Sequence, residues 1–167
     1  MTMFKVSPSI QVKTQALATT CWLTCLEMLF QWKKDKGDSS KDKSQICNII
    51  DEKTQFFSSI MVEKGIGTNE CASVARALGM QPTGTGDYTR DILYDLVSKK
   101  GPLFVAGKWG GSSHVILVTG CSNDSDEIKI VDPWKNYDLS ESDSNLTWLN
   151  SRGSTWKGTE GSVMYWK

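Results

Sequence analysis

The sequence has no net charge, no long hydrophobic run and no apolar leader segment. Its 19 lysines and arginines balance 19 aspartates and glutamates over 167 residues, which argues against nucleic acid or an anionic membrane surface as a partner. The longest helical apolar segment, residues 21–32, contains Glu27 and Gln31 and is too short to cross a bilayer. Residues 1–13 lack the apolar stretch of a signal peptide. We therefore expect no membrane insertion and a soluble protein, cytoplasmic in the cell that makes it.

The sequence also has no closely spaced cysteine pair and only one histidine. The cysteines are odd in number and include no C-x-x-C pair: Cys21, Cys25, Cys47, Cys71 and Cys121. A disulfide scaffold more often shows an even number at close spacing, so we expect reduced thiols, of which one could be reactive. A zinc site built on Cys21 and Cys25 would need two further ligands, and His114 is the only histidine. The composition predicts neither a bound metal ion nor a cofactor.

The periodicity of the apolar residues changes at the break formed by Gly101 and Pro102. Before it, the spacing is helical in five segments, at about residues 21–33, 44–51, 54–64, 68–78 and 89–99. Thr19 or Thr20 is expected to cap the first helix, and Thr68 the fourth. After the break, short β-branched runs predict strands at about 103–107, 115–120 and 128–131, with one or two more within 156–166.

Helices followed by strands predict an α+β fold in which the two halves pack together. We expect a single domain over residues 1–167. Its helical lobe would span about residues 15–100, with a central helix beginning near Cys21. This lobe would pack on an antiparallel sheet lobe at about residues 101–167.

The single histidine and a nearby aspartate end up on adjacent predicted strands. His114 opens one strand, and Asp132 closes the next. In a hairpin centred near Asn123, the two residues lie opposite one another, and opposed side chains on one face are about 4.5–5.5 Å apart at Cβ. A carboxylate in that place fixes the imidazole tautomer and stabilises the imidazolium. We expect Asp132 to orient His114, with Asn136 as the alternative orienter.

Cys21 lies in the predicted first turn of a helix, where the helix dipole and free N–H groups favour an anion. A thiolate beside an imidazolium attacks an acyl carbon readily. Gln15 lies six residues upstream and could donate an amide N–H to the developing oxyanion, together with the backbone N–H of Cys21. Each of these residues alone is more often structural, but their combination and order favour a thiol-based catalytic site.

These motifs resemble papain-like cysteine peptidases, in particular their compact bacterial branch. The resemblance rests on four stretches within about residues 10–134: Gln15 to Cys21-Trp22, Gly101-Pro102-Leu103, residues 114–120 (HVILVTG) and residues 131–134 (VDPW). That branch includes staphopain-like enzymes, secreted effector peptidases and bacteriocin-processing peptidases that cut after a double glycine. The resemblance implies Gln15 as oxyanion donor, Cys21 as nucleophile, His114 as base and Asp132 as orienter. Ala18-Thr19-Thr20 before the cysteine departs from the Cys-Gly-Ser of the cathepsins.

The function that this resemblance implies is endopeptidase action on a protein or peptide substrate. It also implies a bacterial effector or toxin exported by a dedicated secretion system, with a cognate immunity or inhibitor protein, and possible cleavage at a double glycine. The same triad performs deamidation and acyl transfer, and a papain-like fold can also serve as a non-catalytic binding module. For substrate binding we expect a loop at the mouth of the cleft, formed by Trp109, Gly110, Gly111, Ser112 and Ser113. Trp134 is expected to cover the His114–Asp132 pair or to fill core.

Overall fold

The computed structural model of the chain describes residues 2–84, 86–109, 111–134 and 140–167. Its helices are α1 (Cys21–Asp35), α2 (Ile46–Lys53), α3 (Ser58–Lys64), α4 (Cys71–Ala77), α5 (Arg90–Lys100) and α6 (Leu146–Gly153), with 3₁₀ turns η1 (Lys43–Gln45) and η2 (Ser154–Trp156). Its strands are β1 (Met3–Lys5), β2 (Met80–Thr83), β3 (Leu103–Trp109), β4 (Ser112–Ser122), β5 (Glu127–Val131), β6 (Ser142–Asn145) and β7 (Val163–Trp166).

The seven strands of the described residues form one antiparallel sheet, which confirms the α+β class. The order is β2-β7-β3-β4-β5-β6, and β1 pairs with the far end of β4. Gly120 allows this last pairing, because a Cβ at that position would lie 2.7 Å from the carbonyl oxygen of Phe4. The long strand β4 thus has neighbours along its whole length, and its first residues carry His114.

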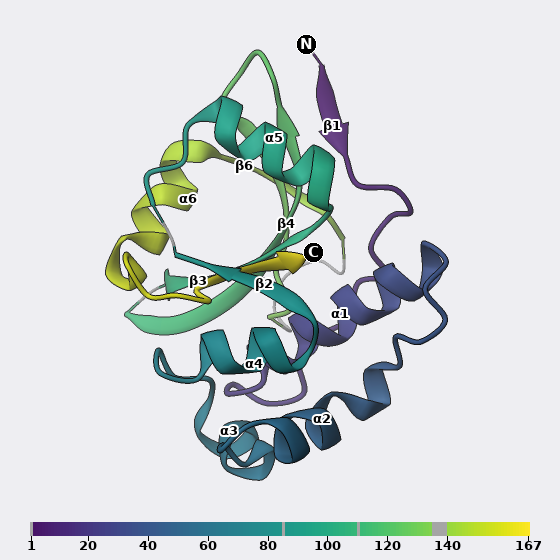
Figure 1. The fold of residues 1–167 in the computed structure, drawn as a ribbon. Helices are drawn as coiled ribbons and strands as arrows, with labels where there is room; N and C mark the ends of the chain where they lie inside the picture. The colour runs from purple at the N-terminus through teal and green to yellow at the C-terminus, as the bar shows by residue number, and fades with distance from the viewer. Residues whose placement is uncertain (1, 85, 110, 135–139) are drawn as a thin grey trace.

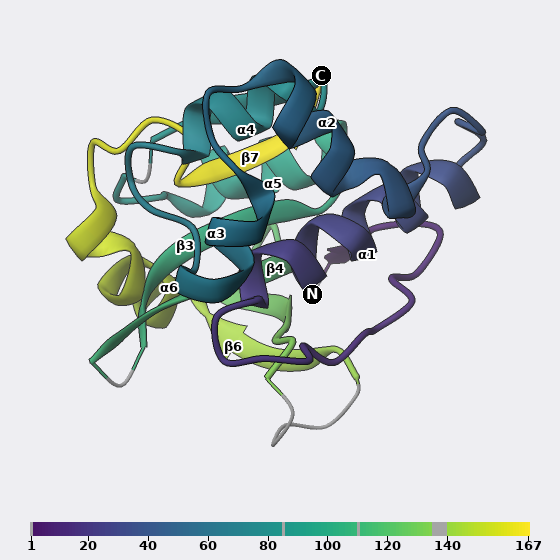
Figure 2. The same ribbon diagram turned by 90° about the horizontal axis from the view of Figure 1, so that it is seen from below.

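The helices cover the sheet from two sides (Figure 1). Helices α1 to α4 lie below the sheet in that view, whereas α5 and α6 lie above and to the left of it. Seen from below, α1, α2 and α3 lie in front of the strands (Figure 2). The chain's two ends lie on the sheet, at β1 and β7, so the helical and sheet segments are interleaved.

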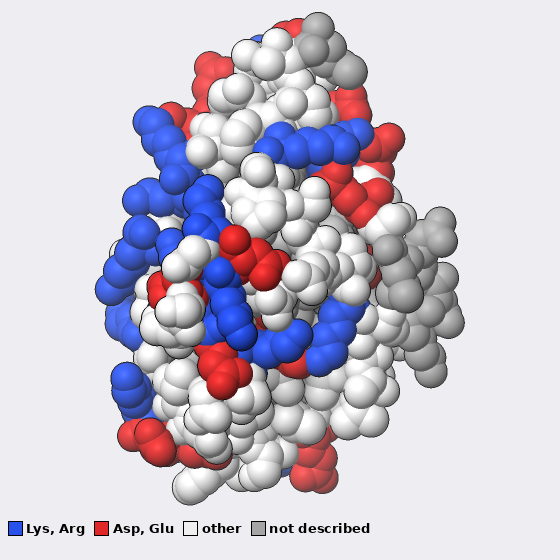
Figure 3. All heavy atoms as spheres, turned by 90° about the vertical axis from the view of Figure 1, so that its right-hand side faces the viewer, with Lys and Arg blue, Asp and Glu red and all other residues white. Residues whose placement is uncertain are grey.

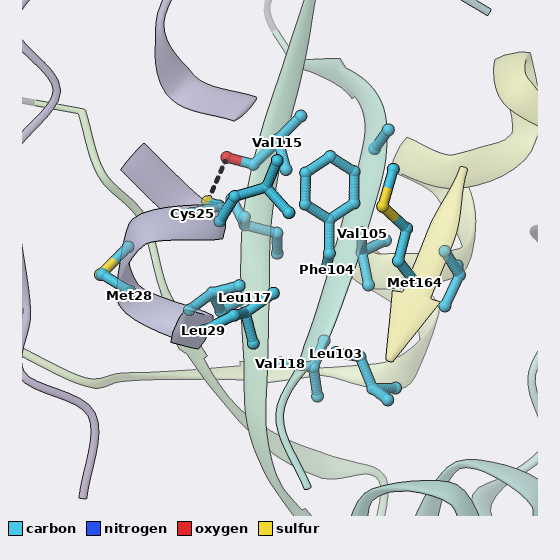
Figure 4. Close-up of a cluster of buried hydrophobic side chains, with 14 of the residues drawn as sticks. Cys25, Met28, Leu29, Leu103, Phe104, Val105, Val115, Leu117, Val118 and Met164 are labelled. Carbon is cyan, nitrogen blue, oxygen red and sulfur yellow. Dashed lines mark hydrogen bonds between the residues drawn. The ribbon is translucent and has the colours of Figure 1, made fainter. Parts of the chain in front are cut away.

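The core forms where α1 packs against β3 and β4. Figure 4 shows Cys25 and Leu29 of α1 facing the side chains of β4 and β3, with Met164 of β7 beyond them, whereas Met28 points to the opposite side of α1. Leu29, Phe104 and Leu117 are completely buried, as is Cys25. Burying a side chain of this size stabilises the fold by about 1.5–3 kcal/mol. This packing fixes the start of α1 against the start of β4.

The structure differs from the expected elements at several boundaries. The helix expected at 54–64 begins only at Ser58, because Thr54 is the C-cap of α2 and has an extended backbone conformation (φ −128°, ψ 169°). Thr68 does not cap α4, whose N-cap is Glu70, whereas the hydroxyl of Thr89 caps α5 by accepting from the N–H of Ile92. The expected lobe boundary is also crossed, since β1 and β2 come from the first half of the chain and α6 comes from the second.

Candidate active site

Helix α1 begins at Cys21, as predicted, but without the expected side-chain cap. Thr20 occupies the N-cap position, and its hydroxyl instead donates to the carbonyl of Leu17 (3.0 Å) and accepts from the Leu17 N–H (3.1 Å). No side chain therefore caps the first turn, and no acidic residue lies in it. The N–H groups at this end remain available to an anion, such as a thiolate or an oxyanion at Cys21.

Cys21 is held between the helix bundle and the sheet. It is 6% exposed, whereas the next residue, Trp22, is fully buried and donates its indole N–H to the carbonyl of Met61 in α3. One turn further along, the Cys25 thiol reaches the carbonyl of Val115 at 3.6 Å (Figure 4). Residues four apart share a helix face. Cys21 therefore faces the same strand as Cys25, one turn nearer to the N-terminal end of α1.

The predicted hairpin register is wrong by two residues, yet the predicted pair forms. The turn occupies residues 123–126, later than assumed, and β4 and β5 pair Leu117 with Val131. Asp132 thus lies across from Ile116 instead of His114. Because the side-chain period of a strand is two, a shift of two keeps both side chains on one face as diagonal neighbours. His114 Nε2 lies 2.7 Å from Asp132 Oδ1, so the predicted contact is confirmed.

The carboxylate of Asp132 is itself held in place. Its Oδ1 accepts a hydrogen bond from the backbone N–H of Trp134 (2.9 Å). The same oxygen is hydrogen-bonded to the ring of His114. The carbonyl of Pro133 accepts the backbone N–H of Gln15 (2.8 Å), which ties the segment before α1 to the segment after β5. The side chains of His114 and Asp132 are each 12% exposed. Asn136, the alternative orienter, lies outside the described residues.

The surroundings of His114 raise its pKa to about 9. Burial of the ring by itself lowers the pKa, because it disfavours the imidazolium. The hydrogen bonds to Asp132 and Cys21, together with the negative charges of both groups, outweigh that effect. Since Asp132 occupies Nε2, Nδ1 is the ring nitrogen left for the Cys21 sulfur. His114 is therefore favoured in its imidazolium form at neutral pH, next to the Cys21 sulfur.

Gln15 lies near the site, but its side chain is engaged. The residue is 3% exposed, and its amide N–H group donates to the carbonyls of Leu17 (2.7 Å) and Ala18 (3.3 Å). Its Oε1 is buried and has no hydrogen-bond partner within the part of the chain that the structure describes. The expected role as oxyanion donor therefore requires the amide to turn away from these carbonyls.

A cavity of about 930 Å³ opens beside the imidazole. It is lined by Trp109, Ser112, His114, Ile130, Asp132, Trp134, Ser140, Ser142, Asp143, Ser144, Asn145, Trp148 and Arg152. Two indole rings stand edge-on to the imidazole, with centroids at 5.6 Å for Trp109 and 6.5 Å for Trp134. Trp134 is therefore part of the cavity wall over the His114–Asp132 pair.

The expected loop before His114 is in fact a tight hairpin between β3 and β4. Trp109 pairs with Ser112, and Lys108 with Ser113. Trp109 and Ser112 line the cavity, whereas Ser113 and Gly111 do not appear in its wall. Alternation along β4 explains the difference, because Ser112 and His114 share a face and Ser113 points to the other one. Gly110 lies outside the described residues.

The far wall of the cavity comes from β6 and α6, which the sequence patterns did not reveal. Trp148 and Arg152 of α6 belong to it. A signal for this helix is present: the Asn145 side chain caps α6 by accepting from the N–H of Trp148, and Leu146 and Leu149 follow at helical spacing. Strand β6, with the sequence SDSN, has no apolar residue and gives no such signal.

The described residues contain no cluster of three or more histidine, cysteine or acidic side chains that could hold a metal ion. None of the helices within this part of the chain is long and apolar enough to span a membrane. On the face shown in Figure 3, lysine and arginine side chains form a band with acidic side chains between them. The absence of a nucleic-acid partner stays a prediction.

Comparison with known proteins places these features in a family. The model of the family described as papain-like cysteine protease AvrRpt2 matches residues 3–151. The fold resembles that of a C39-like peptidase from Bacillus anthracis, with 15% identity and a TM-score of 0.63, covering 100% of this chain and 98% of the other. It also resembles the peptidase domain of Streptococcus ComA, a bifunctional ABC transporter involved in quorum sensing, with 13% identity and a TM-score of 0.51, covering 94% and 96%. No curated protein matches the sequence.

Proposed function

Since this chain belongs to the papain-like cysteine protease AvrRpt2 family and is thus a cysteine peptidase, we propose that Cys21, His114 and Asp132 form its catalytic triad. The observation that carries this proposal is the chain of contacts from Cys21 through the imidazole to Asp132, in which Nε2 lies 2.7 Å from the carboxylate. Cys21 acts as the nucleophile, His114 as the acid and base, and Asp132 as the group that orients the ring and favours its charged form.

The proposed reaction proceeds in two halves. The Cys21 thiolate attacks the carbonyl carbon of the scissile peptide bond, and the His114 imidazolium gives its proton to the leaving amine as the C–N bond breaks. The neutral imidazole then takes a proton from water, whose oxygen attacks the thioester carbon. The acid product leaves, and the thiolate and imidazolium are restored.

The oxyanion of each tetrahedral intermediate needs hydrogen-bond donors. The backbone N–H of Cys21 at the uncapped start of α1 is one proposed donor. Gln15 is the second, once its amide releases the Leu17 carbonyl that it now contacts. A bound substrate carbonyl offers an acceptor for that amide in exchange.

Substitution of the proposed triad tests this assignment. A protein mixture incubated with the wild-type chain should show new N-termini by terminal labelling and mass spectrometry. Cys21→Ala should abolish them, and His114→Ala should slow their formation by about a thousandfold, because general acid–base catalysis contributes on this order. Full activity of His114→Ala would remove His114 from the mechanism. The Cys47→Ala variant serves as control, since that cysteine lies outside the site.

The same experiment addresses the finer proposals. Cleavage after a double glycine is one, supported by the resemblance of the motifs to bacteriocin-processing peptidases, and it predicts Gly-Gly before the new termini. Deamidation or acyl transfer by the same triad is the alternative, and it would leave targets intact but changed in mass.

Action as an exported effector or toxin, with an inhibitor protein in the producer, rests on the resemblance. It predicts that expression of the active chain, but not of Cys21→Ala, harms a recipient cell.

A further inference from the structure

The cavity beside the imidazole lies on the His114 side of the proposed Cys21–His114 pair, away from Cys21. His114 and Asp132 contribute to its wall, but Cys21 does not. In peptide hydrolysis the acyl carbon joins the nucleophile and the leaving amine takes its proton from the acid. The part of a substrate next to His114 is therefore the part that follows the scissile bond. This cavity would receive that leaving segment.

The cavity wall contains a cation, Arg152, for which the described residues supply no counter-ion. Within the described residues, no acidic group forms an ion pair with Arg152, whose Nε is buried without a hydrogen-bond partner. Its guanidinium lies over the ring of Trp148, 5.8 Å from the centroid. A half-buried cation without an ion-pair partner is costly, and an anion in the cavity would offset that cost.

The position of Arg152 is fixed by close packing. A Cβ on Gly107 would lie 2.6 Å from the Arg152 carbonyl oxygen and 2.7 Å from the Trp109 ring. Gly107 is also the residue that pairs with His114 across β3 and β4. The glycine thus lets the end of α6 approach the face of the sheet that carries the His114 side chain, which holds Arg152 on the leaving side of the site.

The acidic residues of the same cavity have partners of their own. Asp132 contacts His114, and Asp143 forms an ion pair with Lys129. Among the described residues of the wall, the guanidinium of Arg152 is therefore the positive side chain left to meet a ligand, and such a planar fork binds a carboxylate through two N–H groups.

We propose that the guanidinium of Arg152 binds a carboxylate of the substrate on the carboxyl side of the scissile bond. This inference rests on the proposed peptidase function and deepens it, because it names a substrate class: acidic residues just after the cut. The carboxylate can belong to an Asp or Glu side chain or to the end of the substrate chain, and the two sources are separable by experiment.

Binding of the leaving product tests the inference without turnover. We would titrate the Cys21→Ala variant with the dipeptide amides Glu-Ala and Gln-Ala and measure affinity by calorimetry. The Glu dipeptide should bind about tenfold more tightly, as expected for a charge-assisted pair, and Arg152→Gln should remove that preference. Equal affinity for the two dipeptides would overturn the proposal. If Gln-Ala with a free carboxyl end binds as tightly as the Glu-Ala amide, the site takes the chain end.

A kinetic test separates recognition from a structural role. With the wild-type enzyme, peptides that differ only in Glu or Gln after the scissile bond should differ about tenfold in kcat/KM, mainly through KM. The Arg152→Glu variant should prefer Lys at that position. If Arg152→Gln slows both peptides equally, its role is structural and the inference fails. Arg76→Gln is the matched control, because Arg76 pairs with Glu160 outside the cavity. Failure to cut any peptide would instead contradict the proposed function, and the titration would still decide the inference.

Discussion

The five cysteines occupy environments that differ in how easily a thiol ionises. Burial raises the pKa of Cys71 to about 12 and of Cys121 to about 11. Burial, followed by the charges of Cys21 and Asp132, raises the pKa of Cys25 well above its usual value, and burial also raises that of Cys47. Cys21 alone lies beside an imidazolium.

We therefore expect iodoacetamide to label Cys21 first. At mildly acidic pH, peptide mapping by mass spectrometry should find Cys21 modified at least about tenfold faster than the other four, since the thiolate is the reactive form. The His114→Ala variant should lose this selectivity. Uniform slow labelling of all five thiols in the wild-type chain would contradict the ion pair.

The raised pKa of His114 predicts an alkaline limit to activity. The proposed mechanism needs the imidazolium, so kcat/KM should be maintained through neutral pH and fall as the pH rises through about 9. Asp132→Asn removes the carboxylate that favours the charged ring, so the alkaline midpoint should move down by about one pH unit or more. A pH profile of kcat/KM on one peptide for both proteins measures this shift. An unchanged midpoint would show that Asp132 does not control the ring.

The contact between His114 and Asp132 was predictable because it depends on alternation along strands and not on exact register. A shift of two residues left both side chains on one face. The position of Cys21 followed from local helix signals.

Arg152 and Trp148 could not be found in the same way, because nothing local links them to His114. They reach the site through the close approach that Gly107 allows, a tertiary contact between distant segments.

The packing of α6 on β3 gives a prediction at this glycine. In Gly107→Ala the new Cβ would meet the backbone of Arg152, so α6 must move, and we expect a loss of about 1–3 kcal/mol in the free energy of unfolding. Urea titration followed by tryptophan fluorescence measures the loss. Gly86→Ala is the matched control, because its Cβ meets nothing within 4 Å. If Gly107→Ala were as stable as Gly86→Ala, α6 could shift away from the new Cβ without loss of stability, and the prediction would be wrong.

Helices and strands with a strong apolar period were predictable, and those without one were not. The expected segments for α1, α5 and β3 to β5 lie within a few residues of their observed bounds. Strand β6 has the sequence SDSN and is held by pairing with β5, and β2 is held by pairing with β7. Such edge strands obtain their conformation from a neighbour, so their own residues carry little local signal.

The sheet joins the first and last parts of the chain, so we expect the protein to unfold as one unit. Strand β7 lies between β2 and β3 and pairs with both. Trp166 at its end is 2% exposed and donates its indole N–H to the carbonyl of Leu29 in α1. Its ring also lies 5.3 Å from that of Phe30. Strand β7 thus contributes to the packing of both the helices and the sheet.

Removal of the Trp166 side chain should therefore destabilise both halves together. Trp166→Ala should cost about 3–5 kcal/mol, a large part of the roughly 5–15 kcal/mol typical of a domain. In urea, far-ultraviolet circular dichroism and tryptophan fluorescence should give one coincident transition, displaced to lower urea in the variant. Phe57→Ala, at a side chain that is 64% exposed, should leave the midpoint almost unchanged. If the variant instead showed two separate transitions, the helices and the sheet would be independent units, and the start of α1 could not depend on β4 to bring Cys21 to His114.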